Sequence, residues 1–509
     1  MLLRKVSVLA CSHLRVISPK WSLLNQRPSH SLPPLTAGAY NVKRGDFAQI
    51  TDNDLTHFQS IIGKDHVITD HNDLEMYNMD WMRSVRGQSK LLLKPKTTNE
   101  VSQIVKHCNE RKLAVCPQGG NTGLVGGSVP VFDEIVLSTQ RMNNIILIDP
   151  VSGVLVCQAG CILEAANNQL SKHSLMAPLD LGAKGSCHLG GNISTNAGGL
   201  RLLRYGSLRG SVLGVEAVLP SGEILDCLSE LRKDNTGYDL KQLLIGSEGT
   251  LGIVTALAIQ CVQKPLSTNL AFLGVESFSN VLSLLRGARR DLGEILSAVE
   301  FMDQDCMRLV TTHLDCSNPI SSHPFYMLIE TSGSNTGHDE EKLSAFLDKI
   351  MSSGLAVDGT LATDVGKLQS IWALRERIAE ATLREGYNYK YDVSLPTEHM
   401  YTMVEESRKR LQDVCLSVFG YGHVGDGNLH LNMTSEKFDP KVLSMIEPFV
   451  YEWVSKYKGS VSAEHGMGFK KRQYMGFTKS KSAITLMHRI KELLDPNGIF
   501  NPYKTLPDP

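Results

Sequence analysis

The spacing of apolar residues changes along the chain and separates it into regions with different expected structure. Between about residues 86 and 262, short β-branched runs alternate with clusters of glycine, a pattern that predicts strands joined by tight turns. Between about residues 266 and 355, a strand pattern is followed by a helical pattern, and this order occurs twice. Such alternation predicts an α+β layer with an antiparallel sheet and its helices on one face.

These patterns predict strands at 151–158, 212–219, 272–275 and 325–330, and helices at 279–292 and 339–352. Residues 46–85 resemble a short helical lead-in. Residues 369–386 predict one amphipathic helix that carries Arg375, and residues 387–393 predict a strand that points Lys390 out on one face. A last helix at 482–494 is expected to stop at the breaker cluster Asp-Pro-Asn-Gly.

Composition describes an ordinary globular protein. A chain of 509 residues suggests about three domains, and 42% hydrophobic and 21% charged residues are typical values. The formal net charge of -1 argues against general nucleic-acid binding, and no internal stretch approaches the roughly 20 apolar residues of a membrane span. The 11 cysteines contain no CxxC pair, which argues against a disulfide framework, a zinc knuckle or an iron–sulfur centre. Reduced thiols in an intracellular compartment are the simpler interpretation.

The N-terminal segment differs from the rest in charge. Residues 1–45 contain no Asp or Glu, and serines are frequent. The basic residues are Arg4, Lys5, Arg15, Lys20, Arg27, Lys43 and Arg44. This composition predicts a mitochondrial transit peptide, with a disordered basic tail as the alternative.

Three glycine-rich segments carry the first candidate chemistry. CPQGGNTGLVGG at 116–127 holds five glycines in twelve residues, which lets successive backbone amides approach an anion closely. PLDLGAKGSCHLGGNISTNAGG at 178–199 mixes glycines with small hydrogen-bonding residues, and LIGSEGTLGIVT follows at 244–255. Each segment alone fits a tight turn, but together they could cradle a pyrophosphate. The chain has neither a Lys-centred phosphate loop nor a strand-GxGxxG-helix unit.

On these three segments the chain resembles the vanillyl-alcohol-oxidase-like flavoproteins, and its second half is similar to their FAD-linked oxidase C-terminal domain. The resemblance implies an α+β fold with a two-subdomain FAD-binding domain and an α+β substrate domain built on an antiparallel sheet. The expected boundaries are 1–45 for the transit peptide, 46–85 for the lead-in, 86–265 for the FAD domain, 266–480 for the substrate and metal domain, and 481–509 for a segment that returns to the flavin domain.

The resemblance also implies which residues contact FAD. They are Pro117, Gly119, Gly120, Asn121, Thr122, Gly123, Gly190, Gly191, Asn192, Thr195, Gly198, Gly199, Glu248, Gly249, Gly252 and, in the returning segment, Asn501. Some relatives attach FAD through a His or Cys of the first glycine loop. Here Asn121 follows the glycine pair and Cys116 precedes the loop, so noncovalent FAD is expected.

The segment GYGHVGDGNLHLN at 420–432 points to a metal site. In one extended strand His423 and His430 would lie roughly 23 Å apart. The Asp-Gly pair between them predicts a tight turn, which folds the chain back and brings both rings to one side. A glycine hairpin with two incidental histidines is the alternative. With Glu464 of SAEHGMG the two rings would form a two-His, one-carboxylate site for zinc or iron, and the resemblance implies zinc.

Open positions on such a metal suit the hydroxyl and carboxylate of a 2-hydroxy acid. His465 is then placed to accept the hydroxyl proton as general base, while the α-hydrogen leaves as hydride to the flavin. The resemblance implies substrate contacts from Arg375, Lys390, Asn432, Glu464 and His465. Taken alone, Arg375 fits a solvated helix face. Ala379 departs from the family pattern, in which a threonine can follow Arg375 by one helical turn and contact the distal carboxylate.

Together with the cationic residues that suit a dicarboxylate, the resemblance implies the oxidation of (R)-2-hydroxyglutarate to 2-oxoglutarate in the mitochondrial matrix. The alternatives are a D-lactate or glycolate dehydrogenase of the same fold, a nonredox flavin transferase such as the alkyl-glycerone-phosphate synthases, and a noncatalytic scaffold. The chain shows no haem or iron–sulfur motif, so an external acceptor must reoxidise the flavin, and the resemblance implies electron transfer flavoprotein. A homodimer is a working expectation. The sequence contains no heptad run from which the oligomeric state could be predicted.

Overall fold

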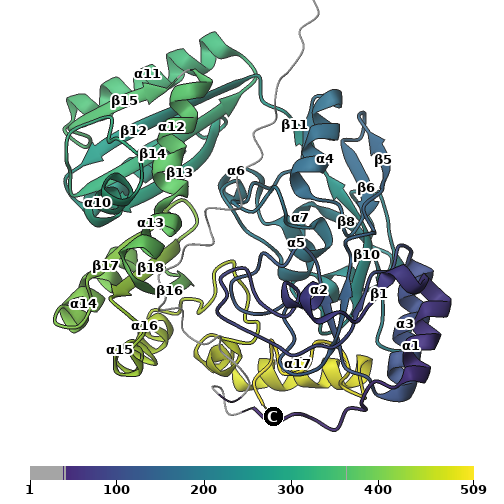
Figure 1. Cartoon of the computed structure of the whole chain (residues 1–509). Coiled ribbons are helices and arrows are strands. Elements are labelled where there is room, and N and C mark those ends of the chain that lie inside the picture. The colour runs from purple at the N-terminus through teal and green to yellow at the C-terminus, as the bar shows by residue number, and fades with distance from the viewer. Residues whose placement is uncertain (1–37, 39–41, 363, 509) are drawn as a thin grey trace, which may run out of the picture. The chain divides into compact units, whose positions relative to one another are not determined.

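A small, mostly parallel sheet begins the folded chain. The computed structural model describes residue 38, residues 42–362 and residues 364–508 (Figure 1). In this sheet β2, β4 and β3 run parallel and β1 pairs antiparallel with β2. The strands are β1 (Val67–Ile68), β2 (Leu92–Leu93), β4 (Ile135–Ser138) and β3 (Val115–Gln118). Helices α1 (Asp52–Ile62) and α3 (Thr98–Arg111) bury Phe58 and Ile104 in the same core as Leu93 and Leu137.

A second sheet is wholly antiparallel and holds the other glycine-rich segments. Its order is β5 (Ile145–Asp149), β6 (Val154–Gln158), β10 (Ile253–Gln260), β8 (Val212–Val218) and β9 (Ile224–Cys227). Helices α4 (Leu163–Leu170) and α5 (Leu189–Thr195) share its hydrophobic core. The strands predicted at 151–158 and 212–219 correspond to β6 and β8, so the glycine clusters do separate strands, as the pattern predicted.

The second half of the chain is built on one antiparallel sheet of seven strands. The order is β15 (Asp358–Ala362), β12 (Ser267–Val275), β14 (Phe325–Gly333), β13 (Leu296–Asp303), β17 (Ser417–His423), β18 (Asn428–Ser435) and β16 (Tyr387–Ser394). The predicted strands at 272–275, 325–330 and 387–393 are parts of β12, β14 and β16. The α+β class and the antiparallel substrate sheet are therefore confirmed.

Helices cover both faces of this sheet, so the expectation of helices on one face is wrong. Along β12, Leu273 joins a core with α9 (Phe278–Asp291) and α11 (Thr336–Ser352), while Phe272 joins a different core with α10 (Gln304–His313) and α12 (Val365–Glu376). A strand buried on both faces is apolar throughout and shows no alternation. Eight of the nine residues of β12 are buried. The sequence of this strand therefore gave no sign that one face is exposed and the other covered, and the second layer of helices was not predicted.

The helix predicted at 369–386 is two helices, and this prediction is corrected. α12 ends at Glu376, Arg377 leaves the helical conformation with ψ near 4°, and α13 spans Ile378–Glu385. The apolar side chains of both helices still point to one core, because Leu374 of α12 and Ile378 of α13 are buried in the same cluster. The apolar periodicity therefore continues through the break, and for this reason the sequence pattern could not reveal the break.

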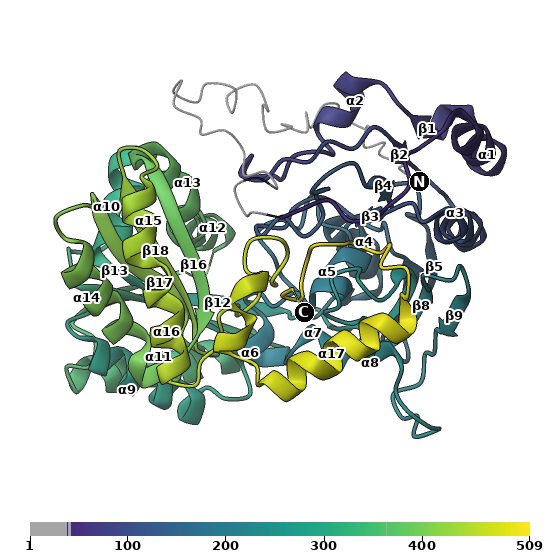
Figure 2. The same cartoon turned by 90° about the horizontal axis from the view of Figure 1, so that it is seen from below.

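The C-terminal segment returns to the first sheet, as expected. The Val115 amide donates to the Ile499 carbonyl over 2.8 Å, and the Asn501 amide donates to the Val115 carbonyl over 2.8 Å. The preceding helix, α17 (Lys481–Leu494), is drawn in yellow at the bottom of Figure 1 and is seen from below in Figure 2. The Lys491 ammonium reaches the Thr250 carbonyl at 2.7 Å.

Most of the expected transit peptide lies outside the described residues. Its last residues belong to the folded chain, because Arg44 Nε pairs with Asp133 Oδ1 at 2.6 Å and the Gly45 amide donates to the Tyr503 hydroxyl over 2.8 Å. The boundary at residue 45 stays a prediction. Among the residues that the structure describes, no helix combines the length and apolar character needed to cross a bilayer.

Candidate functional site

The β17–β18 hairpin brings His423 and His430 together. The turn at 424–427 contains Gly427 with φ of +81°, and a Cβ there would lie 2.6 Å from the Leu395 carbonyl oxygen. Glycine is needed for both reasons. The strand register sets Tyr421 opposite His430, and the two imidazole centroids lie 5.3 Å apart. The predicted turn and its consequence are thus confirmed.

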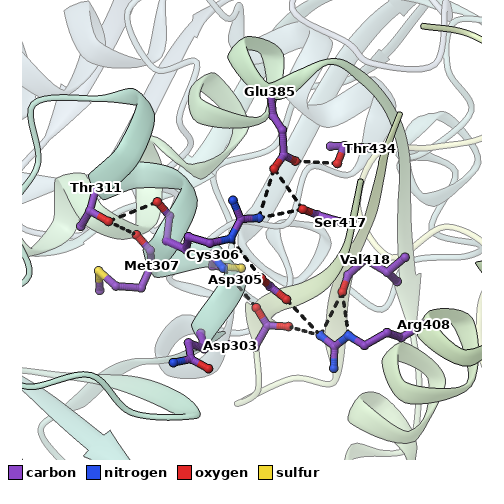
Figure 3. Close-up of polar contacts among 12 residues, drawn as sticks. Asp303, Asp305, Cys306, Met307, Thr311, Glu385, Arg408, Ser417, Val418 and Thr434 are labelled. Carbon is purple, nitrogen blue, oxygen red and sulfur yellow. Dashed lines mark hydrogen bonds and ion pairs between the residues drawn. The ribbon is translucent and has the colours of Figure 1, made fainter. Parts of the chain in front are cut away.

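Side chains anchor this hairpin where its neighbouring strand ends. β13 pairs with β17 only at Phe301 and Met302. Beyond that point the Gly420 amide donates to Asp303 Oδ2 over 3.0 Å, and Arg408 Nη2 donates to the Val418 carbonyl over 2.9 Å (Figure 3). These side chains satisfy backbone groups that would otherwise be buried without partners.

The third strand of the site adds two charged side chains to the same face. β16 sets Lys390 opposite Asn432 and Asp392 opposite His430. Residues paired directly across antiparallel strands point to the same face, so these side chains lie with the histidines. The predicted orientation of Lys390 on one face and of Asn432 beside His430 agrees with this register.

Glu464 lies at the centre of three imidazoles. Its Oε1 is 3.9 Å from His423 Nε2, 3.8 Å from His430 Nε2 and 3.7 Å from His465 Nε2. Four ligands placed roughly 2.0–2.2 Å from a zinc ion lie about 3.3–3.5 Å from one another. The distances from Glu464 Oε1 to His423 Nε2 and to His430 Nε2 are slightly longer than this, so a small shift would let these three groups close around a small divalent cation. His423, His430 and Glu464 would hold it.

Asp392 belongs to the same cluster but has other partners. Asp392, His430, Glu464 and His465 also offer ligand atoms within 4.8 Å of one another. Asp392 Oδ2 already accepts the Glu464 and His465 amides, each over 3.0 Å, and Oδ1 accepts Asn428 Nδ2 over 2.8 Å. A carboxylate so fully engaged suits the outer support of His430 and His465 better than direct ligation.

Burial and neighbouring charges place most of these groups in the forms that bind a metal. Burial lowers the pKa of His430 well below its ordinary value, which keeps that ring neutral. Burial opposes ionisation of Glu464, but the hydrogen bond and charge of His423 prevail and lower its pKa. For His423 burial is outweighed by the Glu300 carboxylate, which raises its pKa, so metal binding there releases a proton.

Arg375 is buried beside this cluster and does not lie on a solvated helix face. Its Nε donates to Glu300 Oε2 over 2.8 Å, and its guanidinium lies 4.5 Å from the centre of the Tyr421 ring. Its two terminal nitrogens make no hydrogen bond to any residue that the structure describes. Lys390 likewise has no ion-pair partner among the described residues, and burial lowers its pKa. Among the described residues, the terminal nitrogens of Arg375 and the Lys390 ammonium are thus left without protein partners beside the cluster.

The remaining predicted substrate residue, Asn432, sits in a short polar chain. Its Oδ1 accepts Asn388 Nδ2 over 2.9 Å, and Asn388 also reaches the Thr382 hydroxyl at 3.2 Å. Ala379 lies beyond the helix break after Arg375, so the two do not share one continuous helix face.

Glu300, Asp392 and Tyr421 are site residues that the sequence analysis missed. Each lies on a strand of the seven-stranded sheet, and Glu300 and Asp392 are almost completely buried at 1% exposure. A carboxylate in the middle of a wholly buried strand, as Glu300 is in VEFMD, was the available signal.

The glycine-rich segments meet one another as expected for a cofactor cradle. A Cβ on Gly119 would lie 3.7 Å from the Gly191 Cα, and one on Gly249 would lie 3.2 Å from Pro117 Cγ. Cβ atoms on Gly123 and Gly191 would meet nothing within 4 Å, so both face open space. Within the described part of the chain, the successive backbone amides of residues 119–123 donate to no protein acceptor.

Buried polar atoms in the same segments also fit a bound dinucleotide. Asn192 Oδ1 is buried without a partner among the described residues. Asn121 adopts φ of +51° and fixes the first loop by donating to the Met79 carbonyl over 2.8 Å. Thr195 Oγ1 donates to the Gly191 carbonyl over 3.0 Å, within α5. The residues present therefore fit a flavin dinucleotide along residues 117–123 and 190–199.

Two predicted flavin contacts serve mainly to join protein segments. Glu248 Oε1 and Oε2 accept the Met467 and Gly468 amides, each over 2.7 Å. Asn501 Nδ2 donates to the Glu248 carbonyl over 2.7 Å, and its Oδ1 accepts Lys504 Nζ over 2.6 Å. These side chains tie the flavin half to the loop that follows Glu464.

Family models match both halves of the chain. An FAD binding domain matches residues 89–228, and the C-terminal domain of FAD linked oxidases matches residues 264–505. Two solved structures share the fold. An alkyldihydroxyacetonephosphate synthase is 18% identical with a TM-score of 0.70, covering 94% of this chain and 89% of its own. A p-cresol methylhydroxylase is 15% identical with a TM-score of 0.71, covering 90% and 97%. The vanillyl-alcohol-oxidase-like fold is confirmed.

The chain belongs to the FAD linked oxidases. Among them it is a member of the FAD-dependent 2-hydroxy acid dehydrogenases, with the mitochondrial D-2-hydroxyglutarate dehydrogenases as relatives. The protein of Danio rerio is 58% identical over 91% of this chain and 86% of its own length. That of Rattus norvegicus is 57% identical over 93% and 88%. A D-2-hydroxyglutarate–pyruvate transhydrogenase of Saccharomyces cerevisiae is 47% identical over 94% and 99%.

Proposed function

We propose that this chain oxidises (R)-2-hydroxyglutarate to 2-oxoglutarate, with noncovalent FAD and a divalent metal, preferably zinc. One observation carries the proposal: the two terminal nitrogens of Arg375 and the Lys390 ammonium have no hydrogen-bond partner among the described residues, and both side chains lie beside the three-imidazole cluster around Glu464. A substrate with a carboxylate at each end can use both features. The names of the relatives point to the same substrate.

The cofactor assignments follow from the donor sets. His423, His430 and Glu464 would hold the metal, and the glycine segments at 117–123 and 190–199 would hold FAD, with Glu248, Gly249, Gly252 and Asn501 closing the cradle. Cys116 is fully buried, and its sulfur already contacts the Ser128 carbonyl at 3.3 Å and Lys504 Nζ at 3.2 Å. This supports noncovalent FAD, because the thiol is engaged within the protein.

When bound, the metal would supply Lewis acidity to the substrate hydroxyl, and FAD would accept the hydride. The protein side chains then have separable tasks. His465 takes the hydroxyl proton, because burial lowers its pKa and keeps the imidazole neutral. Asp392 orients that ring, with Oδ2 at 3.6 Å from His465 Nδ1.

The cationic groups and the polar chain would orient the two substrate carboxylates. Arg375 offers two terminal nitrogens in a fixed plane, a geometry that suits bidentate binding of a carboxylate. Lys390 supplies a point charge and Asn432 a hydrogen-bonding amide on the same face. Because Ala379 lacks the hydroxyl found at that place in the family pattern, we expect the distal carboxylate to depend more on Arg375 and Lys390.

The cellular setting is proposed from the relatives, whose names place them in mitochondria. We propose import by a transit peptide within residues 1–45, action in the matrix, and electron transfer flavoprotein as the acceptor. A homodimer is part of the same proposal. The yeast relative named for transfer to pyruvate makes a 2-oxo acid the alternative acceptor.

The test is anaerobic mixing of the purified flavoprotein with (R)-2-hydroxyglutarate while the visible absorbance of oxidised flavin is followed. D-lactate is run beside it, and both are repeated after chelation and after zinc is restored. Bleaching by the glutarate that is lost on chelation and regained with zinc supports the proposal. Bleaching by D-lactate alone favours the monocarboxylate dehydrogenase, and bleaching by neither favours a nonredox transferase.

A further inference from the structure

One buried carboxylate joins the proposed metal site to the proposed carboxylate clamp. Glu300 lies on β13 and is 1% exposed. Its Oε1 lies 2.5 Å from His423 Nδ1, and its Oε2 accepts Arg375 Nε over 2.8 Å. The two partners come from different elements, β17 and α12, which converge on this strand from far apart in the sequence.

Each contact fixes a different property of its partner. A carboxylate beside Nδ1 holds the proton on that nitrogen, which leaves the Nε2 lone pair of His423 free for a metal. The contact to Nε holds the plane of the Arg375 guanidinium against the Tyr421 ring, so its two terminal nitrogens keep one direction.

We propose that Glu300 is a positioning residue that sets metal affinity and dicarboxylate selectivity together. An ionised glutamate can accept from two donors at once, one on each oxygen. A glutamine of the same shape has one acceptor and one donor group, so it can accept from Arg375 or from a protonated His423 Nδ1, but not from both. If its amide nitrogen faces His423, the ring must carry its proton on Nε2 and cannot bind a metal there.

This inference rests on the proposed function, because it assumes a metal at His423 and a substrate carboxylate at Arg375. It goes beyond that function in assigning both to one residue that touches neither the metal nor the substrate. A structural role alone would lower stability without changing selectivity. The deciding readouts are therefore zinc affinity and the ratio of kcat/KM for (R)-2-hydroxyglutarate to that for D-lactate.

Glu330 provides a matched control on the neighbouring strand, β14. It is also 1% exposed, and it accepts from Arg201 and from Trp372 Nε1, the latter over 2.9 Å. It thus bridges an arginine and a ring N–H without contacting His423 or Arg375 among the described residues. Glu330→Gln reports what the loss of a buried bridging carboxylate does by itself.

The experiment compares Glu300→Gln, Glu330→Gln and the wild-type holoprotein in zinc titrations and in steady-state kinetics at saturating zinc. We expect Glu300→Gln to bind zinc roughly 10- to 100-fold more weakly and to lose about tenfold in the selectivity ratio, with neither change in Glu330→Gln. Wild-type zinc affinity with unchanged selectivity in Glu300→Gln overturns the inference while leaving the proposed function intact.

Failure of the proposed function is a separate outcome, seen as wild-type protein that takes up no zinc and shows no preference for the dicarboxylate. It overturns the inference as well. If Glu300→Gln does not fold, Glu300→Asp keeps the charge but is one methylene shorter, so it can reach one partner and not both. We expect it to lose zinc affinity or selectivity, and a variant that keeps both overturns the assignment.

Discussion

The Gly199 amide donates to Glu464 Oε2 over 2.9 Å, so the flavin half of the chain contacts the central carboxylate of the proposed metal site. A Cβ on the preceding Gly198 would lie 3.0 Å from the same oxygen, which shows how closely the two segments approach. Because Oε2 faces the flavin segment and Oε1 faces the three imidazoles, the Glu464 side chain contacts both the proposed FAD site and the proposed metal site.

We therefore predict that removing FAD weakens zinc binding. A hydrogen bond to a charged group contributes about 1.5–3 kcal/mol, which corresponds to roughly 10- to 100-fold in affinity if the glycine segment loses its position. The coupling must be reciprocal, so zinc removal weakens FAD binding by the same factor. Zinc titrations of the protein before flavin removal, after removal and after reconstitution check this. Equal zinc affinity in all three states would contradict the coupling.

His465→Asn is expected to lower kcat by about 10²–10⁴-fold, the usual loss for a general base. The variant should keep its zinc and flavin, because His465 is not among the three proposed ligands and its amide contact to Asp392 comes from the backbone. Metal analysis and flavin absorbance are measured beside the rate. Loss of zinc together with the rate would instead make His465 a ligand.

Lys390→Met is expected to raise KM for (R)-2-hydroxyglutarate roughly 10- to 100-fold, since one charged hydrogen bond to the substrate is lost. D-lactate lacks a distal carboxylate, so its KM should change far less. The substitution keeps the length of an unbranched chain and removes a cation that has no protein partner among the described residues. Steady-state kinetics with both substrates decide the matter. Equal losses on the two substrates would remove Lys390 from the clamp.

Asp303→Asn should change how stability depends on pH. Burial raises the pKa of Asp303 to about 6, although the Gly420 amide and Arg408 act in the opposite direction. A carboxyl whose folded pKa is raised stabilises the fold most below its unfolded pKa near 4, and this contribution of roughly 2–3 kcal/mol is lost as the pH rises through about 6.

Asparagine keeps the shape and can still cap α10, but it does not titrate. The stability difference between wild type and Asp303→Asn should therefore shift in favour of the variant between pH 4.5 and pH 7, values that bracket the titration. Denaturant unfolding at both pH values measures it. Asp305→Asn, which removes a more exposed carboxylate from the same arginine, controls for the loss of charge near Arg408. A difference that stays constant with pH would show that Asp303 does not titrate in this range.

Local rules account for what the sequence predicted well. The turn at Gly427 and the alternation of β18 depend on neighbouring residues only, so the approach of His423 and His430 could be predicted from their spacing. The glycine segments were recognised for the same reason. The helix break at Arg377 was not predicted, because the apolar periodicity of the sequence continues through the break unchanged.

By itself, then, the sequence determined the hairpin between His423 and His430, the returning C-terminal segment and the family. Only the tertiary structure decided that Glu300 meets Arg375 and His423, and that Gly199 meets Glu464. These contacts join residues 75, 123 and 265 positions apart. The pairing of β13 with β17 brings Glu300 near His423, while the packing of α12 on the sheet supplies Arg375. A buried carboxylate requires partners, but which partners it finds depends on the packing of distant elements, which no local pattern in the sequence records.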